Sequence, residues 1–308
     1  MRDLDLTTLR LFVAVCDSRS IARAAEQQAM VGSAISKRLA ALEDTLGTQL
    51  LVRRRRGVEP TPAGETLLEH ARALLARSAE VERDMAGYAA GMRGHVRVLA
   101  TQSAIAESLT DDVAEFLKLP QHHQIRVDLE EGVSTRVLRG VREGSASLGI
   151  CWDAADLSGL QTHAWREDRL AVVMPAGHPL AGRNSLLFAD TLAYDQVSLP
   201  PDSAVQIMLQ RAAALAGGSI RYRVVAATFD AALRVVRSGL AITVLPDLLS
   251  RTYADAFGLV VTPLDDAWAT RRFAICFRSL ESLTPAARLL LDHLTRAAQR
   301  AHAAASAA

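Results

Sequence analysis

Hydroxyl-bearing and cationic side chains gather on one face of a helix predicted to begin near residue 32. The residues that share this polar face are Ser33, Ser36, Lys37 and Arg38. The opposite face repeats apolar residues at intervals of three and four, at Ile35, Leu39, Leu42 and Leu46. Such a helix can enter the major groove of double-stranded DNA, because hydroxyl groups and Lys bond base edges or phosphates while the apolar face packs on a supporting helix. An ordinary amphipathic surface helix is the alternative that this stretch alone leaves open.

A shorter helix is predicted directly before this one, so that the two form a helix-turn-helix. Ser20 is a suitable N-cap for the shorter helix, and its hydroxyl is a further candidate DNA contact. The alanine-rich pattern stops at residues 30–32, where we expect Gly32 to permit an unusual backbone turn. Gly47 is expected to end the second helix.

A run of four arginines follows and points to the same partner. Short strands on either side of Gly57 are predicted to form a hairpin wing. Its tip would carry Arg53, Arg54, Arg55 and Arg56. Consecutive cations repel one another and stabilise no fold, whereas a loop placed against DNA phosphates gives them a use. The alternative, a merely solvated charge run, is weak next to a helix-turn-helix.

Two further helices are predicted to support this region. The first carries an apolar stripe at Leu6, Leu9, Phe12, Val13 and Cys16. The second starts at Thr61 and Pro62, a cap and a favoured first residue. It then repeats, in steps of four and three, Leu67, Ala71, Leu74, Ser78, Val81, Met85, Tyr88 and Met92. This heptad seam predicts a dimer-forming linker helix, with packing against the first helix of the same chain as the alternative.

From His95 onward short β-rich runs alternate with helical patterns, which indicates a parallel α/β sheet flanked by helices. Strands are predicted at 96–100, 125–129, 147–151, 170–174, 196–199, 222–227, 241–245 and 272–277. Helices are predicted at 104–117, 134–142, 204–216, 229–237 and from 284 to about 301, and the trailing alanines are expected to fray. Four strand-to-helix corners carry polar residues where such sheets bind ligands.

These corners, together with Trp152 after another strand, supply the candidate ligand-binding residues. They are Thr101, Gln102, Ser103, Ser134, Thr135, Trp152, Ser203, Thr228 and Phe229. Helix capping is the alternative for each corner alone, since Ser, Thr and Asp are preferred caps. If Asp153, Asp202 or Asp230 faces the cleft, an anionic ligand is disfavoured and a neutral or cationic one favoured.

The ordered motifs resemble the LysR-type transcriptional regulators over the whole chain. The matching segments are residues 9–15 (LRLFVAV), 20–26 (SIARAAE), 33–37 (SAISK), 42–43 (LE), 46–47 (LG) and 61–64 (TPAG). One departure is Val31-Gly32, where the family often has Ser-Gln, so Ser33, Ser36 and Lys37 would carry more of the base readout. The domains would then be a winged helix-turn-helix (1–62), a linker helix (63–92) and an effector-binding region (93–308).

The resemblance implies an α+β protein whose two-lobed, periplasmic-binding-protein-like α/β effector domain has two crossovers between its lobes. It further implies a homodimer or homotetramer, a small-molecule effector held partly by hydroxyls at the first corner, and a change in DNA bending that affects RNA polymerase. A solute-binding module or enzyme of the same two-lobed fold, joined to an interaction domain, is the competing interpretation.

Composition sets further limits on function. The formal net charge is +1, so charge is clustered and not in overall excess. The three cysteines are far apart in the sequence, which fits a reducing cytoplasm. For Cys151, near a predicted pocket, we favour a buried structural thiol over the alternative of a redox sensor. We expect no signal peptide, no membrane span, no cofactor and no metal site, because no fitting motif occurs. No catalytic constellation is apparent, so an enzyme is not expected.

Overall fold

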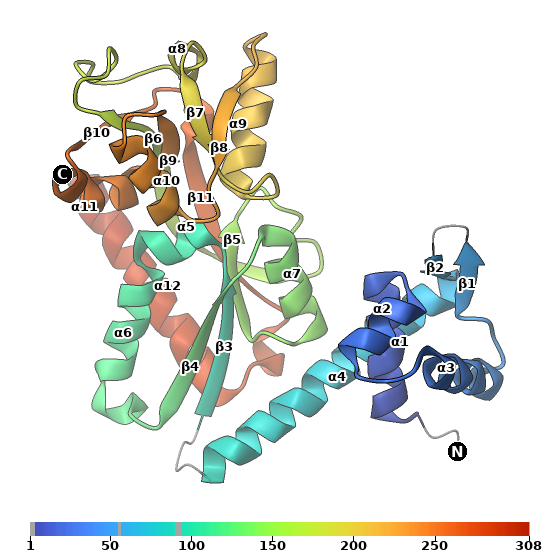
Figure 1. Cartoon of the computed structure of the whole chain (residues 1–308). Helices are drawn as coiled ribbons and strands as arrows, with labels where there is room; N and C mark the ends of the chain where they lie inside the picture. The colour runs from blue at the N-terminus through green and yellow to red at the C-terminus, as the bar shows by residue number, and fades with distance from the viewer. Residues whose placement is uncertain (1–3, 55–56, 90–93, 308) are drawn as a thin grey trace. The chain divides into compact units, whose positions relative to one another are not determined.

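The computed structural model describes residues 4–54, 57–89 and 94–307, which divide into two compact units. Figure 1 colours the N-terminal unit blue to cyan and the other unit from green to red. No helix in the described part of the chain combines the length and the apolar character that crossing a bilayer requires.

The N-terminal unit confirms the predicted helix-turn-helix and wing. Its elements are α1 (Leu6–Ser18), α2 (Ile21–Gln27), α3 (Gly32–Leu46), β1 (Leu51–Arg54), β2 (Gly57–Pro60) and the long α4 (Pro62–Ala89). Phe12, Val15 and Ile35 are fully buried where α1, α2 and α3 meet. Of the stripe predicted on α1, Leu6 is an exception, since it is 37% exposed.

The predicted helix ends are mostly confirmed, with one correction in the turn. Ser20 caps α2 by accepting a hydrogen bond from the Arg23 N–H, and Gly47 ends α3 with φ 69°. The left-handed residue between α2 and α3 is Ala29 (φ 51°) and not Gly32, which is the first residue of α3. Ala29 takes this conformation because α2 ends in a Schellman motif, in which the Met30 N–H donates to the Ala25 carbonyl.

The second unit contains a mixed sheet, so the predicted parallel pairing holds for a part of the strands and the others pair antiparallel. Its strands are β3 (Gly94–Ala100), β4 (Ile125–Glu131), β5 (Leu148–Trp152), β6 (Gln161–Pro175), β7 (Asp195–Ser198), β8 (Arg221–Val225), β9 (Thr243–Pro246), β10 (Leu259–Pro263) and β11 (Thr270–Phe277). The main sheet has the order β10-β6-β11-β5-β3-β4, and β9 also pairs with β6. Strand β3 is parallel to β4 and β5, and β7 to β8, whereas β6 pairs antiparallel with β9, β10 and β11.

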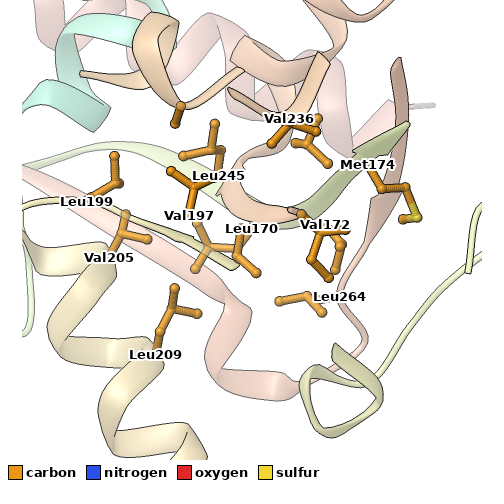
Figure 2. Close-up of a cluster of buried hydrophobic side chains, with 14 of the residues drawn as sticks. Leu170, Val172, Met174, Val197, Leu199, Val205, Leu209, Val236, Leu245 and Leu264 are labelled. Atoms are coloured by element: carbon orange, nitrogen blue, oxygen red, sulfur yellow. The ribbon is translucent and has the colours of Figure 1, made fainter. Parts of the chain in front are cut away.

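The helices of this unit cover the strands in two lobes. They are α5 (Gln102–Ala104), the π-helical segment Ile105–Leu109, α6 (Thr110–Lys118), α7 (Ser134–Glu143), α8 (Phe188–Thr191), α9 (Ala204–Leu215), α10 (Phe229–Arg237), α11 (Asp247–Phe257) and α12 (Pro285–Ala307). Short 3₁₀ turns lie at Pro120–His122, Ala267–Ala269 and Leu280–Ser282. Each lobe has its own apolar core, and Figure 2 shows that of the second lobe, built from β6, β7, β9, α9 and α10.

Two crossovers join the lobes, as the family resemblance implied. Strand β6 pairs with β11 in the first lobe through Arg169 and with β9 and β10 in the second lobe from Leu170 onward. The chain returns at the start of β11, which pairs with β5. The second half of β6 is buried on both faces, which explains its continuous apolar sequence. That sequence is what predicted a strand here.

Candidate nucleic-acid interface and ligand pocket

The polar face of α3 lies outward, as the sequence predicted. Ile35, Leu39 and Leu42 are buried on its inner face. On the outer face Ser33 and Lys37 are exposed and Ser36 is half-buried. No hydrogen bond or ion pair to another described residue engages these three side chains, so they are available to a partner. The arrangement fits a helix that presents short hydroxyls and one flexible cation to a groove.

Arg38 occupies a different environment from Lys37. Its Nη1 donates to Asp5 Oδ2 at 3.1 Å and to Thr8 Oγ1 at 3.3 Å, at the beginning of α1. The hydroxyl of Thr8 and the N–H groups of Thr7 and Thr8 donate to Asp5 and lower the pKa of its carboxyl. Arg38 therefore pairs with a charged carboxylate, which fixes α3 against α1 and leaves a part of the guanidinium exposed.

The wing is fixed in place by main-chain contacts. The Val58 N–H donates to the Arg19 carbonyl at 3.1 Å. A Cβ at Gly57, whose φ is +134°, would lie 2.2 Å from that same carbonyl oxygen, so only glycine permits the contact. At the other side of the hairpin, Glu43 Oε1 of α3 accepts hydrogen bonds from the N–H groups of Leu50 and Leu51.

Two of the four wing arginines can be described. Arg53 and Arg54 lie on β1 and are exposed. Arg54 Nε donates to Glu59 Oε2 at 3.3 Å across the hairpin, a solvent-exposed pair that holds it weakly. Arg55 and Arg56 lie outside the described residues. Of the two described wing arginines, Arg53 is thus the one that makes no ion pair with a described residue.

The heptad seam of α4 is covered in its first part only. Leu68 and Ala71 are buried in the N-terminal core, and Leu67 packs against it. Intramolecular packing, the alternative considered for the seam, therefore accounts for this part. Farther along, Leu74, Val81 and Met85 are 48%, 52% and 56% exposed. The predicted seam ends at Tyr88 and Met92, of whose side chains the structure gives no description.

A cavity of about 330 Å³ opens between the strand ends of the two lobes. Six of the residues predicted to bind a ligand line it: Thr101, Gln102, Ser103, Ser134, Ser203 and Phe229. The sequence prediction missed Glu131, Gly132, Val133, Arg136, Leu199, Pro200, Ala204, Val205 and Ala227. Asp202, one of the three acids considered for the cleft, also lines it. The cavity thus combines hydroxyls, two carboxylates and an apolar wall.

Three predicted residues do not line the cavity. Trp152 pairs with Phe273 in the β5–β11 ladder, and Thr135 is exposed in the first turn of α7. Thr228 caps α10 by accepting from the Ala231 N–H at 3.2 Å. For Thr228 helix capping accounts for the hydroxyl, as it does in part for Ser203, whose Oγ accepts from the Gln206 N–H.

Thr101 has a buried hydroxyl without a partner. The residue is 7% exposed, and its Oγ1 makes no hydrogen bond among the described residues. Its N–H donates to the Ile150 carbonyl at 3.0 Å, which fixes the backbone at the end of β3. A buried hydroxyl left unbonded costs about 1–3 kcal/mol. A ligand that accepts or donates a hydrogen bond here would recover that loss.

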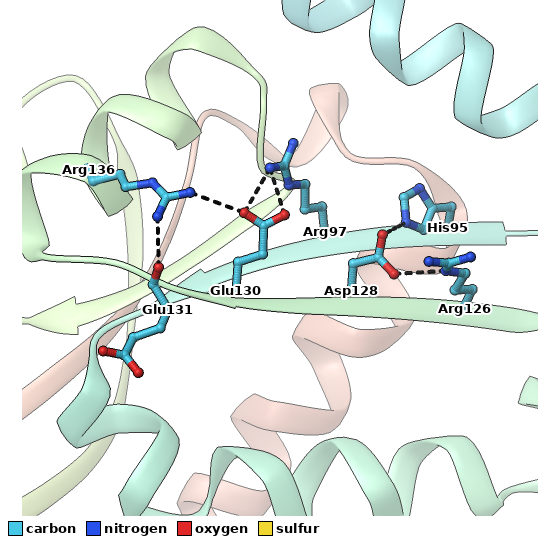
Figure 3. Close-up of polar contacts among 7 residues, drawn as sticks. All are labelled: His95, Arg97, Arg126, Asp128, Glu130, Glu131 and Arg136. Atoms are coloured by element: carbon cyan, nitrogen blue, oxygen red, sulfur yellow. Dashed lines mark hydrogen bonds and ion pairs between the residues drawn. The ribbon is translucent and has the colours of Figure 1, made fainter. Parts of the chain in front are cut away.

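Charged side chains around β4 form an ordered network beside the cavity (Figure 3). Glu130 bridges Arg97 and Arg136, at 2.7 Å and 3.3 Å, and the hydrogen bond from Arg97 lowers the pKa of Glu130. Arg136 also donates to the Glu131 main-chain carbonyl at 3.0 Å, while the Glu131 carboxylate points away. The guanidinium of Arg136 is therefore already committed, although the residue lines the cavity.

A second charged cluster lies where the lobes join. Arg271 of β11 and Asp168 of β6 form an ion pair with almost no exposed surface, with Arg271 Nε 2.8 Å from Asp168 Oδ1. Glu107, in the π-helical segment, has a buried carboxylate oxygen without a described partner. Burial, with a smaller contribution from Asp168, raises the pKa of Glu107 to about 7.

The cysteines are buried thiols. Cys16, Cys151 and Cys276 are free, and burial raises the pKa of Cys16 to about 12. The Cys276 thiol donates to the Gly149 carbonyl at 3.3 Å in the interior of the β5–β11 pair. Cys151 does not line the cavity, so its surroundings fit a packing role better than the sensor role considered from sequence. Within the described residues no group of three His, Cys, Asp or Glu could hold a metal ion.

Comparison with known proteins gives consistent matches over both units. The profile of the bacterial regulatory helix-turn-helix protein, lysR family, matches residues 6–65, and that of the LysR substrate binding domain matches residues 89–299. An uncharacterised HTH-type transcriptional regulator of Mycobacterium bovis is 31% identical over 212 residues, which are 67% of this chain and 68% of that protein.

Solved structures agree in fold. The crystal structure of full-length CbnR complexed with its target DNA has a TM-score of 0.63 at 21% identity, covering 95% of this chain and 99% of that one. The effector binding domain of QuiR in complex with shikimate has a TM-score of 0.60 at 16% identity, covering 68% of this chain and 98% of that one. These likenesses confirm the predicted fold class.

Proposed function

Because this chain belongs to the LysR family of bacterial transcriptional regulators, we propose that it binds specific sites on double-stranded DNA as a homodimer or homotetramer. A small molecule in the cavity of the C-terminal unit adjusts this binding. Residues 1–62 form the DNA-binding domain, 63–92 the dimer-forming linker and 93–308 the effector domain. The regulator acts in the cytoplasm and alters the access of RNA polymerase to its promoters.

The outward face of α3 is the observation that carries this proposal. Ser33, Ser36 and Lys37 are accessible together, and the wing that bears Arg53 is anchored by the Gly57–Arg19 contact in the same unit. In this arrangement α3 reads base edges and the wing arginine contacts phosphate. Ser20 serves first as the α2 cap, and its hydroxyl remains able to donate to a phosphate.

The two-lobed unit provides the route for control by a ligand. The cavity is lined by Thr101 and Ser134 from the first lobe and by Ser203 and Phe229 from the second, and two crossovers are the chain connections between the lobes. A ligand that touches both lobes binds the closed arrangement better than an open one. Only such a difference in affinity shifts the equilibrium between arrangements, and with it the spacing of the DNA-binding domains.

Binding of upstream promoter DNA across a salt series tests this function. A dimer with several phosphate contacts should lose ~10³–10⁵ in affinity between roughly 50 and 200 mM salt. Arg53→Ala should weaken binding to specific and random DNA alike, whereas Lys37→Ala should also reduce the preference for the specific site. Lys118→Ala removes an exposed cation in the other unit and serves as the control.

The contrary results are equally distinct. A weak response with little salt dependence would favour a solute-binding module or an enzyme of the same two-lobed fold. Equal losses on specific and random DNA for both Lys37→Ala and Arg53→Ala would refute the roles assigned to α3 and the wing.

A further inference from the structure

We propose that the effector is a small zwitterion of the α-amino-acid class, whose ammonium group lies between Glu131 and Asp202 and whose carboxylate reaches Thr101. This inference rests on the proposed function, because it specifies the ligand of the same cavity. It adds a cation-binding subsite to a pocket whose hydroxyl corner was expected from sequence.

Two unpaired carboxylates indicate the cationic part of the ligand. Glu131 ends β4 in the first lobe, and Asp202 precedes α9 in the second, and both line the cavity. Both are exposed, and neither carboxylate has a hydrogen-bond or ion-pair partner among the described side chains. An ammonium group with three donors can serve both acids at once.

The nearby arginines do not neutralise these acids. Arg97 and Arg136 both bind Glu130, and the guanidinium of Arg136 approaches Glu131 only at its main-chain carbonyl (Figure 3). Two carboxylates, those of Glu131 and Asp202, line the cavity together with one guanidinium group, that of Arg136, so its lining holds an excess of negative charge. A ligand that carried negative charge alone would be repelled here.

The anionic part of the ligand follows from Thr101 and from the helix ends that line the cavity. The Thr101 hydroxyl is buried, unbonded and free to donate. The helices α7, α9 and α10 present their first residues Ser134, Ala204 and Phe229 to the cavity. Their N-terminal N–H groups and dipoles favour a carboxylate. The hydroxyl and the helix ends are thus complementary to one end of a zwitterion, and the two acids to its other end.

The spacing and volume fit a single amino acid. Ala100 is the strand partner of Glu131, so Thr101, the next residue, begins about one strand spacing (~4.8 Å) away from Glu131. A cavity of about 330 Å³ is at the small end of ligand pockets. Leu199, Val205 and Phe229 provide an apolar wall for the ligand's side chain.

The same arrangement couples binding to lobe closure. Glu131 and Asp202 come from different lobes and carry like charge, so in the empty site they oppose close approach of the lobes. An ammonium group placed between them changes this repulsion into attraction. The ligand therefore has a higher affinity for the closed arrangement, which is the condition for acting as an effector.

Thermal stability and titration calorimetry of the full-length protein test the assignment. The probes are the twenty standard L-amino acids, with the N-acetyl and α-hydroxy-acid counterparts of any that bind. We expect at least one amino acid to raise the Tm with dose and its two counterparts to bind at least about tenfold more weakly. Glu131→Gln, Asp202→Asn and Thr101→Val should each weaken binding at least about tenfold. Glu167→Gln, which alters an exposed acid outside the cavity lining, should leave it unchanged.

Several results would overturn the assignment without touching the proposed function. These are the absence of a stability shift with any amino acid, α-hydroxy acids that bind as tightly as amino acids, or unchanged affinity in both Glu131→Gln and Asp202→Asn. In each case salt-dependent binding of promoter DNA would still support a regulator, with an effector of other chemistry. Loss of the DNA response itself would instead count against the proposed function.

Discussion

Burial determines how the ionisable side chains between the two lobes pair and titrate. The Arg271–Asp168 pair is hidden between β11 and β6, and desolvation makes such a pair stable only when its geometry is good. Arg271 Nη1 has no described partner, and Glu107 nearby keeps a buried oxygen unbonded. Glu107 therefore faces Asp168, Arg271, Arg166 and Asp112, two carboxylates and two guanidinium groups, in a poorly hydrated site.

Glu107→Gln should stabilise the protein at high pH relative to the unchanged chain. Burial raises the pKa of Glu107 from 4.5 to about 7. Between these values the unfolded chain releases the proton while the folded protein retains it, so the free energy of unfolding falls as pH rises through this window. Because Gln cannot ionise, the free energy of unfolding of the variant does not fall in this pH window. Urea unfolding of both proteins at pH 5, 6, 7 and 8 measures it.

The difference between the two proteins should grow from pH 5 to pH 7 and then level off. Glu115→Gln changes a largely exposed acid and is the matched control, for which no pH-dependent difference is expected. A constant difference between Glu107→Gln and the unchanged chain at all four pH values would contradict the assignment.

The sequence predicted those pocket residues whose side chains are also typical helix caps. Thr101, Ser134 and Ser203 follow strands and begin helices, so their positions are visible from the chain alone. Glu131 precedes the same corner, but whether its carboxylate turns toward Arg136 or toward the cavity depends on the partners that Arg136 takes up across the fold. Glu107 gave no signal either, since the charged residues that act on it, among them Asp168 of β6 and Arg271 of β11, are distant in sequence.

Most elements with a predominantly apolar face were predicted, although β10 and α11 were missed. The first half of β6 was missed because residues 161–169 are mostly polar, and it becomes a strand through its pairing with β11. The α2–α3 turn was placed correctly, but its left-handed residue was not, because glycine is the usual choice and the chain uses Ala29 instead. A non-glycine residue in this conformation is strained by about 1 kcal/mol.

Ala29→Gly should therefore stabilise the N-terminal unit by about 1 kcal/mol, since glycine reaches positive φ without steric strain. Gly47→Ala is the matched control in the opposite direction. Gly47 has φ 69° at the end of α3, and no atom lies within 4 Å of an added Cβ, so conformation alone is altered. Thermal unfolding should show a higher Tm for Ala29→Gly and a lower one for Gly47→Ala. A lower Tm for both would disprove the strain at Ala29.

At the scale of the whole molecule, the exposed half of α4 is the feature that its own unit leaves unexplained. Leu74, Val81 and Met85 follow the heptad spacing and remain about half exposed, whereas Ala71 is buried and Leu67 is partly buried against the N-terminal core. A second copy of the same helix presents the matching surface, and pairing of the two helices would join two DNA-binding domains into one bivalent DNA-binding unit. We therefore expect a dimer, because this local pattern meets no covering partner among the described residues of its own unit.

Leu74→Glu should break this dimer without unfolding the unit, because Leu74 is 48% exposed and a charge there opposes pairing only across the seam. Light scattering should show the monomer mass, and the salt dependence of DNA binding should fall by about half, since half of the phosphate contacts are lost. Glu69→Lys alters charge on the opposite face of α4 and should leave both values unchanged. An unchanged mass for Leu74→Glu would rule out the seam as the interface. A monomer mass with an undiminished salt dependence would mean that DNA binding does not depend on the dimer.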